Sequence, residues 1–150
     1  MFSPKHILVP SDFSAYSDQA LSLARDIALQ FHSKIHLLHV VDEKIQQCAV
    51  DYCLDISTVE RFRREARDIS EKKLREELER IGRDGIEVMI EVREGPPHEE
   101  IAKMQHEKGI DLVVIGSRGR SGIRGHVGSV TEKVMRLAGC PVMLVGARST

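Results

Sequence analysis

The sequence predicts an α/β fold, an open five-stranded parallel sheet covered on both faces by helices. Five short apolar runs, rich in β-branched residues, lie at 6–9, 35–41, 88–92, 112–115 and 142–145. Runs such as HILV, LVVI and VMLV are apolar without alternation, which is typical of strands buried on both faces. Segments of helical period separate these runs. Right-handed crossovers then give a doubly wound, three-layer α/β/α sandwich.

In the first half of the chain, the predicted helices are segments whose apolar residues recur every three or four positions. The first such pattern follows the first strand and runs from Tyr16 to Phe31. The second follows the second strand and runs from Ser57 to Ile81, with charged residues on its other face. Ser57 and Glu60 have the spacing of a capping box, so we expect the second helix to begin there.

In the second half, proline and glycine mark the predicted ends of the helices. The third helix follows Pro96-Pro97, where proline suits the first turn, and ends near Gly109. The fourth helix is expected to begin at Ser129, capped by that side chain, and to stop at Gly139. Leu137 is expected on its buried face.

The chain of 150 residues has the size of one domain, and we expect a single domain over residues 1–150. It contains no internal repeat, low-complexity tract or linker. The one long connection without periodicity, at 42–56, is predicted to be a flexible flap or a short extra helix.

Charge and cysteine content limit the class of protein. The 22 basic and 23 acidic residues give a net charge of −1, which argues against a general nucleic-acid or membrane-surface binder. No signal peptide and no apolar run of about 20 residues is evident. The three cysteines lack a C-x-x-C pair, so no metal site is predicted and reduced thiols are expected. The expected location is the cytoplasm.

A glycine-rich segment at 116–129 joins the fourth strand to the fourth helix. It contains five glycines, three arginines and His126. Glycine lets backbone N–H groups turn toward an anion, and a helix N-terminus adds a favourable dipole. We therefore predict phosphate binding here, with the Ser129 hydroxyl or the amides of Val130 and Thr131 as donors. The alternatives are a mobile surface loop and, for His126, either phosphate contact or phosphoryl transfer.

The segment matches neither of the common phosphate motifs. It lacks G-x-x-x-x-G-K-[ST], which excludes a Walker loop, and the first strand is followed by PSDFS instead of the G-x-G-x-x-G of a dinucleotide fold. Ligands of open α/β sheets bind beyond the carboxyl ends of the strands. Asp12 stands at such an end, where its carboxylate can accept a hydrogen bond from a ribose or base. The alternative is that Asp12 or Ser14 caps the first helix, and Asp12 can fill both roles.

Four motifs, HILVPSDFS, LLHVVDE, EGPPHEEIAKMQHEKGIDLVVIGSRG and GSVTEKVMRLAGCPVMLV, give the chain a marked resemblance to the universal stress protein family. The resemblance covers almost the whole chain and implies an adenine nucleotide alpha-hydrolase-like sheet with strand order 3-2-1-4-5. Nucleotide-binding members carry G-x-x-G, about nine residues, and then G-[ST]. Here Gly116-Ser-Arg-Gly119 is followed by eight residues and then Gly128-Ser129, which suggests AMP or ADP over ATP.

What the family resemblance implies can be assigned residue by residue. The adenosine end would be lined by Pro10, Ser11, Asp12, the backbone of Val40, Ile115 and Gly116. The phosphates would be bound by Arg118, Gly119, Gly128, Ser129, Val130 and Thr131. The resemblance also suggests a homodimer through the last strand, which runs from Pro141 to Val145, and an apolar sheet edge of this kind needs covering.

The sequence therefore predicts a stress-response regulatory protein that binds AMP, ADP or ATP and acts as a homodimer. Its partners would be the nucleotide, a second copy of the chain and a protein still to be identified, with no nucleic acid and no membrane. Two other classes stay open. One is a slow ATPase or phosphotransferase that uses Asp12 or His126 with Mg²⁺; the other is a dimeric scaffold without nucleotide.

Overall fold

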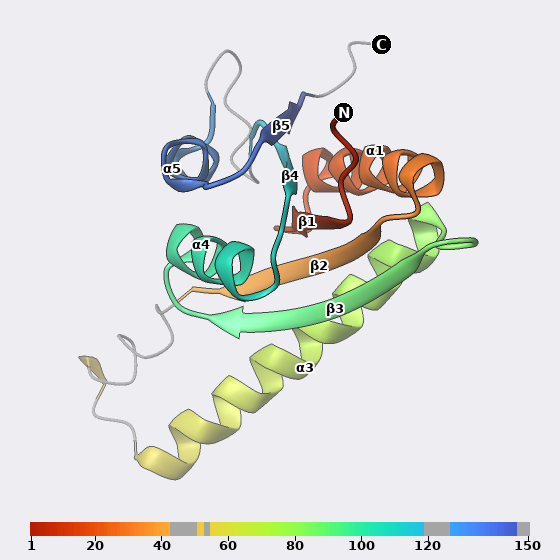
Figure 1. Ribbon diagram of the computed structural model, residues 1–150. Helices are drawn as coiled ribbons and strands as arrows, with labels where there is room; N and C mark the ends of the chain where they lie inside the picture. Colours follow the sequence, from red (N-terminus) through yellow and green to blue (C-terminus); the bar gives the residue numbers. More distant parts are fainter. Residues whose placement is uncertain (43–50, 53–54, 119–126, 147–150) are drawn as a thin grey trace.

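A five-stranded parallel sheet forms the centre of the molecule (Figure 1). The computed structural model describes residues 1–42, 51–52, 55–118 and 127–146. The strands are β1 (His6–Pro10), β2 (Lys34–Val41), β3 (Glu87–Glu94), β4 (Leu112–Gly116) and β5 (Val142–Val145). Their order in the sheet is β3-β2-β1-β4-β5, with parallel pairing throughout. This confirms the predicted fold and strand order.

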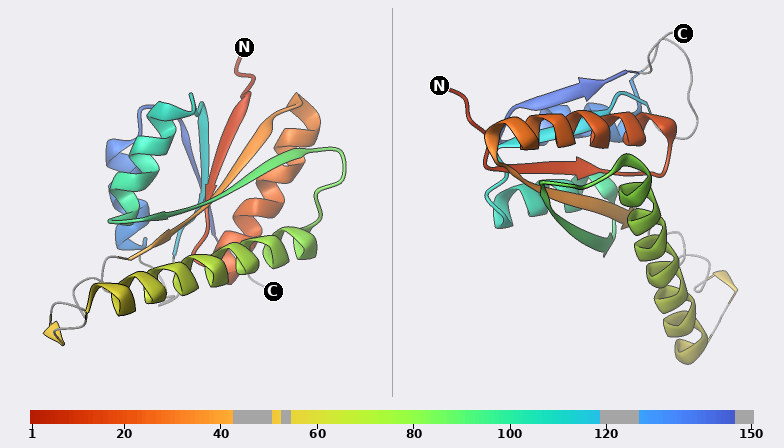
Figure 2. Two further views of the ribbon diagram at one scale, coloured as in Figure 1. Left: turned by 90° about the horizontal axis from the view of Figure 1, so that it is seen from below. Right: turned by 90° about the vertical axis from the view of Figure 1, so that its right-hand side faces the viewer.

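Helices cover both faces of the sheet (Figure 2). They are α1 (Ala15–Phe31), α3 (Ile56–Ile81), α4 (Pro97–Glu107) and α5 (Ser129–Leu137). On one face, α1 and α3 pack over a core that includes Ile7, Val9, Leu37 and Leu74. On the other face, α4 and α5 enclose a second core formed by Leu8, Leu38, Ile101, Met104, Ile110, Val113, Ile115 and Val134. Because consecutive strand residues point to opposite faces, each buried strand contributes to both cores.

The start of α3 differs from the prediction. Asp55 caps this helix, its carboxylate accepting a hydrogen bond from the Thr58 N–H at 2.7 Å, so Ser57 lies inside the first turn. The expected apolar face is only half buried, since Leu74 is fully enclosed whereas Phe62 and Ile69 are 42% and 56% exposed. Figure 2 shows the reason: the first turns of α3 extend past the sheet.

Helix α5 begins at Ser129, as predicted, but its capping residue differs from the prediction. The helix is capped by Gly128, which has no side chain to offer, and Ser129 is the first helical residue and not the cap. Leu137, expected on the buried face, is 56% exposed because α5 lies beside the edge of the sheet. The helix N-terminus is therefore without a side-chain cap, at the end of the molecule where the strands terminate.

The remaining expectations concern smaller features. Most of the connection at 42–56 lies outside the described residues, as do Cys48, Cys53 and His126. Among the residues described, no helix combines the length and the apolar character that crossing a membrane requires. Within the same ranges, no group of three His, Cys, Asp or Glu side chains is arranged to hold a metal ion.

Candidate functional site

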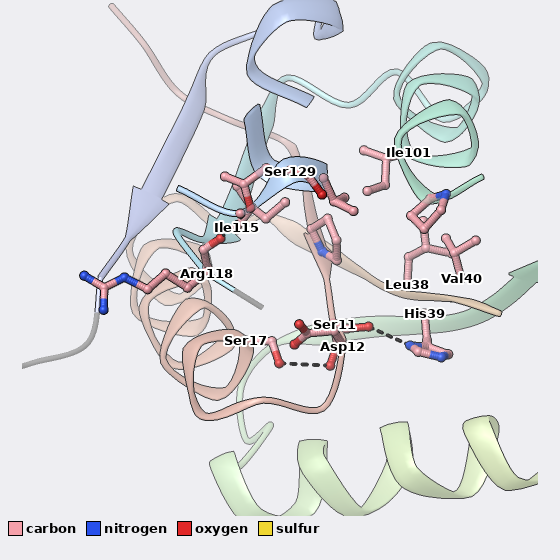
Figure 3. A pocket seen from close by; sticks show the side chains of 16 residues that line it. Ser11, Asp12, Ser17, Leu38, His39, Val40, Ile101, Ile115, Arg118 and Ser129 are labelled. Carbon is pink, nitrogen blue, oxygen red and sulfur yellow. Dashed lines mark hydrogen bonds between the residues drawn. The ribbon is translucent and has the colours of Figure 1, made fainter. Parts of the chain in front are cut away.

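A cavity of about 280 Å³ lies at the carboxyl ends of β1, β2 and β4 (Figure 3). Strand order reverses between β1 and β4, and open α/β sheets bind ligands at this kind of position. The volume is near the lower limit of small-molecule pockets, which span about 300–1,000 Å³. The cavity is lined by Pro10, Ser11, Asp12, Ser17, Leu38, His39, Val40, Pro97, Ile101, Ile115, Gly116, Arg118, Gly128, Ser129, Val130 and Thr131.

Eleven of the twelve residues singled out in the sequence line this one cavity, although they come from four separate segments. The twelfth, Gly119, lies outside the described residues. Sequence reasoning missed five further lining residues, which are Ser17, Leu38, His39, Pro97 and Ile101. Leu38 and His39 could have been predicted as lining residues, because they lie near the end of a predicted strand, next to Val40.

The β1–α1 loop, residues 11–14, has a tightly fixed backbone. Asp12 Oδ1 accepts a hydrogen bond from the Ser14 N–H at 3.0 Å, and Ser14 Oγ accepts one from the Ser17 N–H at 3.3 Å. Ser14 is thus the cap of α1, and Asp12 supports the turn before it. Phe13 adopts a φ of 66°, a left-handed conformation that costs free energy for a residue with a side chain. Strained backbone of this kind is concentrated at binding sites.

His39 supports the same loop from β2. Its Nδ1 lies 2.7 Å from the Ser11 carbonyl oxygen, and its ring lies on the Phe13 ring with centroids 4.2 Å apart. Since a carbonyl oxygen can only accept, the Nδ1 atom carries the proton and donates it. The contact keeps Ser11 in place at the mouth of the cavity.

A buried carboxyl group stands behind Ser11. Glu77 projects from α3, is 1% exposed, and its Oε2 lies 2.7 Å from Ser11 Oγ. Burial raises the pKa of Glu77 to about 7, and the Ser11 hydrogen bond opposes this shift only in part. Ser11, on the polar side of the cavity, is therefore hydrogen-bonded to a carboxyl group whose pKa is near neutral pH.

The opposite wall of the cavity is apolar. Leu38, Ile101 and Ile115 are buried and belong to the core between the sheet and the helices α4 and α5. Figure 3 shows Leu38, Val40 and Ile101 on one side of the cavity and Asp12 and Ser11 across from them. A flat apolar ring with polar groups along one edge suits this combination.

The end of β4 is held close to α1 and α5. Thr131 Oγ1 donates a hydrogen bond of 2.9 Å to the Gly116 carbonyl oxygen, so this hydroxyl supports the wall. A Cβ on Gly116 would lie 2.8 Å from Tyr16 Cβ and 3.0 Å from Tyr16 C. Glycine is thus required at position 116 by packing, whatever the ligand.

The N-terminus of α5 opens into the cavity. The Gly128 N–H donates to the Ser117 carbonyl oxygen at 2.9 Å, which joins the helix to the end of β4. The first N–H groups of an α-helix have no acceptor within the helix, and Gly128 offers no side-chain cap for them. The amides of Ser129 and Val130 are accordingly suited to an anion.

Arg118 is directed away from the centre of the cavity. Its guanidinium lies 5.8 Å from the centre of the Tyr16 ring, and Nη1 is 3.5 Å from the Tyr16 hydroxyl. Figure 3 shows the group pointing away from Ser11 and Asp12. The predicted phosphate contact thus requires a different rotamer of this side chain.

Comparison with known proteins places these features in a family context. The model of the universal stress protein family matches residues 4–146. The chain is 29% identical, over 97% of each chain, to the universal stress protein MJ0577 of Methanocaldococcus jannaschii. It is 31% identical to the universal stress protein YxiE of Bacillus subtilis, over 93% of this chain and 97% of that one.

Solved structures extend the likeness to three dimensions. The structure of MJ0577 superposes with a TM-score of 0.85 at 26% identity, covering 99% of this chain and 100% of that one. A universal stress protein in complex with cAMP gives 0.65 at 20% identity, covering 97% of this chain and 98% of that one. One from Archaeoglobus fulgidus in complex with dAMP gives 0.60 at 19% identity, covering 96% and 99%. At the two lower identities, the likeness is one of fold.

Proposed function

Because this chain belongs to the universal stress protein family, we propose that it is a cytoplasmic stress-response regulator that binds an adenine nucleotide in the cavity described above. Two structural neighbours were solved with cAMP and dAMP, which are both adenine nucleotides. The observation that carries the proposal is the pairing, in one cavity, of an apolar wall with the uncapped N-terminus of α5. This pairing suits a ligand with a flat ring at one end and a phosphate at the other.

In the proposed complex, the adenine ring lies against Val40 and Ile101, and the Asp12 carboxylate accepts a hydrogen bond from the ribose. The phosphate receives hydrogen bonds from the amides of Ser129 and Val130. Arg118 turns from the Tyr16 ring toward the phosphate, exchanging a cation–π contact for a charge-assisted hydrogen bond. AMP, ADP and ATP share this arrangement and differ in the number of phosphates beyond the first.

Calorimetric titration with AMP, ADP and ATP tests the proposal, and the variant V40W is used to block the site. The indole of V40W fills the adenine side of the cavity, so we expect AMP binding to be lost. M89W is the control, because Met89 is an exposed residue of the neighbouring strand β3. Failure of all three nucleotides to bind the unaltered chain, or equal binding by V40W, would contradict the proposal.

We also propose that the protein is a homodimer formed through the strand β5. This strand is the last in the sheet and pairs with β4 on one side only. Met143 and Leu144 of this strand are each 37% exposed, an apolar edge that pairing with a second copy would cover. The edge position and the apolar side chains support the same assignment.

The dimer is tested by L144K, measured by size-exclusion chromatography with light scattering. We expect the unaltered chain to have the mass of a dimer and L144K to have the mass of a monomer. The introduced lysines of the two subunits would repel each other across the paired β5 edges. L29K places the same charge on an exposed leucine of α1 and should leave the dimer intact. A dimeric L144K variant would exclude this edge as the interface.

A further inference from the structure

Glu77 is an acidic residue buried beside the site, and only one of its two carboxyl oxygens has a hydrogen-bond partner among the described residues. It is 1% exposed on α3, and Oε2 contacts Ser11 Oγ at 2.7 Å. Its other oxygen, Oε1, has no hydrogen-bond partner among the described residues. A buried charge with an unpaired oxygen is costly, whereas a neutral acid in the same position loses much less solvation.

The hydrogen bonds of the β1–α1 loop can be counted proton by proton. Ser11 Oγ lies within hydrogen-bond distance of both Glu77 Oε2, at 2.7 Å, and Ser17 Oγ, at 3.2 Å. Ser11 has one hydroxyl proton and cannot donate to both. The Ser17 hydroxyl already donates to the Ser14 carbonyl oxygen at 2.9 Å, so it does not supply the missing proton.

A protonated Glu77 completes this network. Its proton is donated to Ser11 Oγ, Ser11 donates to Ser17 Oγ, and Ser17 donates to the Ser14 carbonyl. The second lone pair of Ser11 Oγ accepts from the Phe13 N–H at 3.1 Å. Every donor then has an acceptor. With an ionised Glu77, Ser11 must donate to the carboxylate, and the contact between Ser11 and Ser17 is left without a proton.

The charges around Glu77 favour the neutral form as well. The titratable groups around the Ser11–Glu77 pair are Asp12 in the loop, Asp18 on α1, His39 on β2, and Lys73 and Arg80 on α3. Asp12 and Asp18 are carboxylates that raise the pKa of Glu77 by repelling its charge. Arg80 lowers that pKa, but its guanidinium is paired with Asp18 at 2.9 Å. The β3 side chains that pack in this core are the apolar residues Val88, Ile90 and Val92.

We propose that Glu77 is a positioning residue for the nucleotide site, and that the proton it donates to Ser11 holds the β1–α1 loop in its binding conformation. The inference rests on the proposed function, because it concerns the same cavity. Loss of the proton acts in two ways. It breaks the hydrogen bond that joins Ser11 to α1, and it adds a buried negative charge behind a cavity that receives an anionic ligand. Binding is therefore coupled to pH through a residue that does not touch the ligand.

The expected pH profile follows from the protonated fraction. Burial raises the pKa of Glu77 to about 7, so the competent fraction falls by about tenfold between pH 6 and pH 8, and the apparent affinity falls with it. The unfolded chain releases this proton near its ordinary pKa of 4.5, so the folded state also loses stability as pH rises from about 4.5 to about 7.

Calorimetry with AMP at pH 6, 7 and 8 tests the coupling in E77Q and in E76Q. The amide of E77Q still donates to Ser11 at every pH, so we expect E77Q to bind AMP as the unaltered chain does at pH 6 and about tenfold more tightly than the unaltered chain at pH 8. Glu76 is exposed on the same helix. E76Q removes a carboxylate there, and we expect it to keep the tenfold fall in AMP affinity between pH 6 and pH 8. The AMP phosphate itself titrates near pH 6, so the comparison is made between variants at each pH.

A second measurement separates this inference from the proposed function. NMR of the ligand-free chain follows the carbon resonance of the Glu77 carboxyl group and the nitrogen and proton resonances of the Ser11 and Phe13 amides with pH. We expect all three to titrate together near pH 7. If no variant binds AMP but this titration is seen, the proposed function fails and the proton-dependent loop stands. A Glu77 midpoint near 4.5, or the same pH profile in E77Q and E76Q, would overturn the inference.

Discussion

S129P is expected to lower AMP affinity by about tenfold to a hundredfold while leaving adenosine affinity unchanged. Proline at this position removes the backbone N–H that we assign to the phosphate, and a hydrogen bond to a charged group contributes about 1.5–3 kcal/mol. The helix itself tolerates the change. Ser129 is the first residue of α5, where proline is favoured, and Gly128 before it has a φ of −61° and a ψ of 150°, which is the extended conformation that precedes proline.

The matched control is S129A, which removes the hydroxyl and keeps the N–H. If the amide is the donor, S129A should bind AMP within a few-fold of the unaltered chain. If the hydroxyl is the donor, S129A and S129P should lose affinity equally, and the assignment to the amide is wrong. Calorimetry with AMP and adenosine, together with circular dichroism to verify the helix content, distinguishes these outcomes.

G116A is expected to destabilise the fold by about 3 kcal/mol, the upper part of the range for overpacked cores. The added Cβ would stand 2.8 Å from Tyr16 Cβ and 3.0 Å from the Tyr16 carbonyl carbon. Neither atom is the end of a flexible side chain, so α1 and β4 must separate. For a chain of this length, such a loss lowers Tm by about 6–12 °C.

G146A is the control for this change, since it adds the same methyl group at the end of the neighbouring strand. Its Cβ would meet only Ser117 Oγ, at 3.8 Å, which is an ordinary van der Waals contact. We expect its Tm to stay within a few degrees of the unaltered chain. Differential scanning calorimetry measures both variants. Equal stability of G116A and the unaltered chain would show that Tyr16 can move aside.

The architecture could be predicted from the sequence because local patterns determine it. Uninterrupted apolar runs such as LVVI identify buried strands, and their alternation with helical patterns determines the class of fold. The strand order and most of the site residues follow from the family resemblance, whereas the roles of Asp12 and of the start of the fourth helix are also predicted from the residues themselves. Eleven of those residues do line one cavity, whereas their contacts with a nucleotide stay a prediction.

The features that could not be predicted depend on contacts between distant segments. The sequence predicts a capping role for Ser129 because serine is a frequent cap, yet the capping position is Gly128, one residue earlier, and nothing local distinguishes the two positions. The sequence predicts Gly116 as a glycine of the phosphate-binding segment, whereas its packing against Tyr16 depends on how α1 crosses β4. Glu77 lies in a run of charged residues typical of a solvated helix face. Only the fold shows that it points at Ser11.

The short helix α5 joins the two proposed interfaces. Its first residues, from Ser129, face the cavity, and after its last residue, Leu137, the chain needs only residues 138–141 to enter the edge strand β5. A phosphate held at one end and a second subunit paired beyond the other would therefore share one rigid element of nine residues. Where nucleotide binding and subunit association both depend on the position of this helix, each changes the affinity of the other by the same factor, so nucleotide would alter dimerisation and dimerisation would alter nucleotide affinity equally.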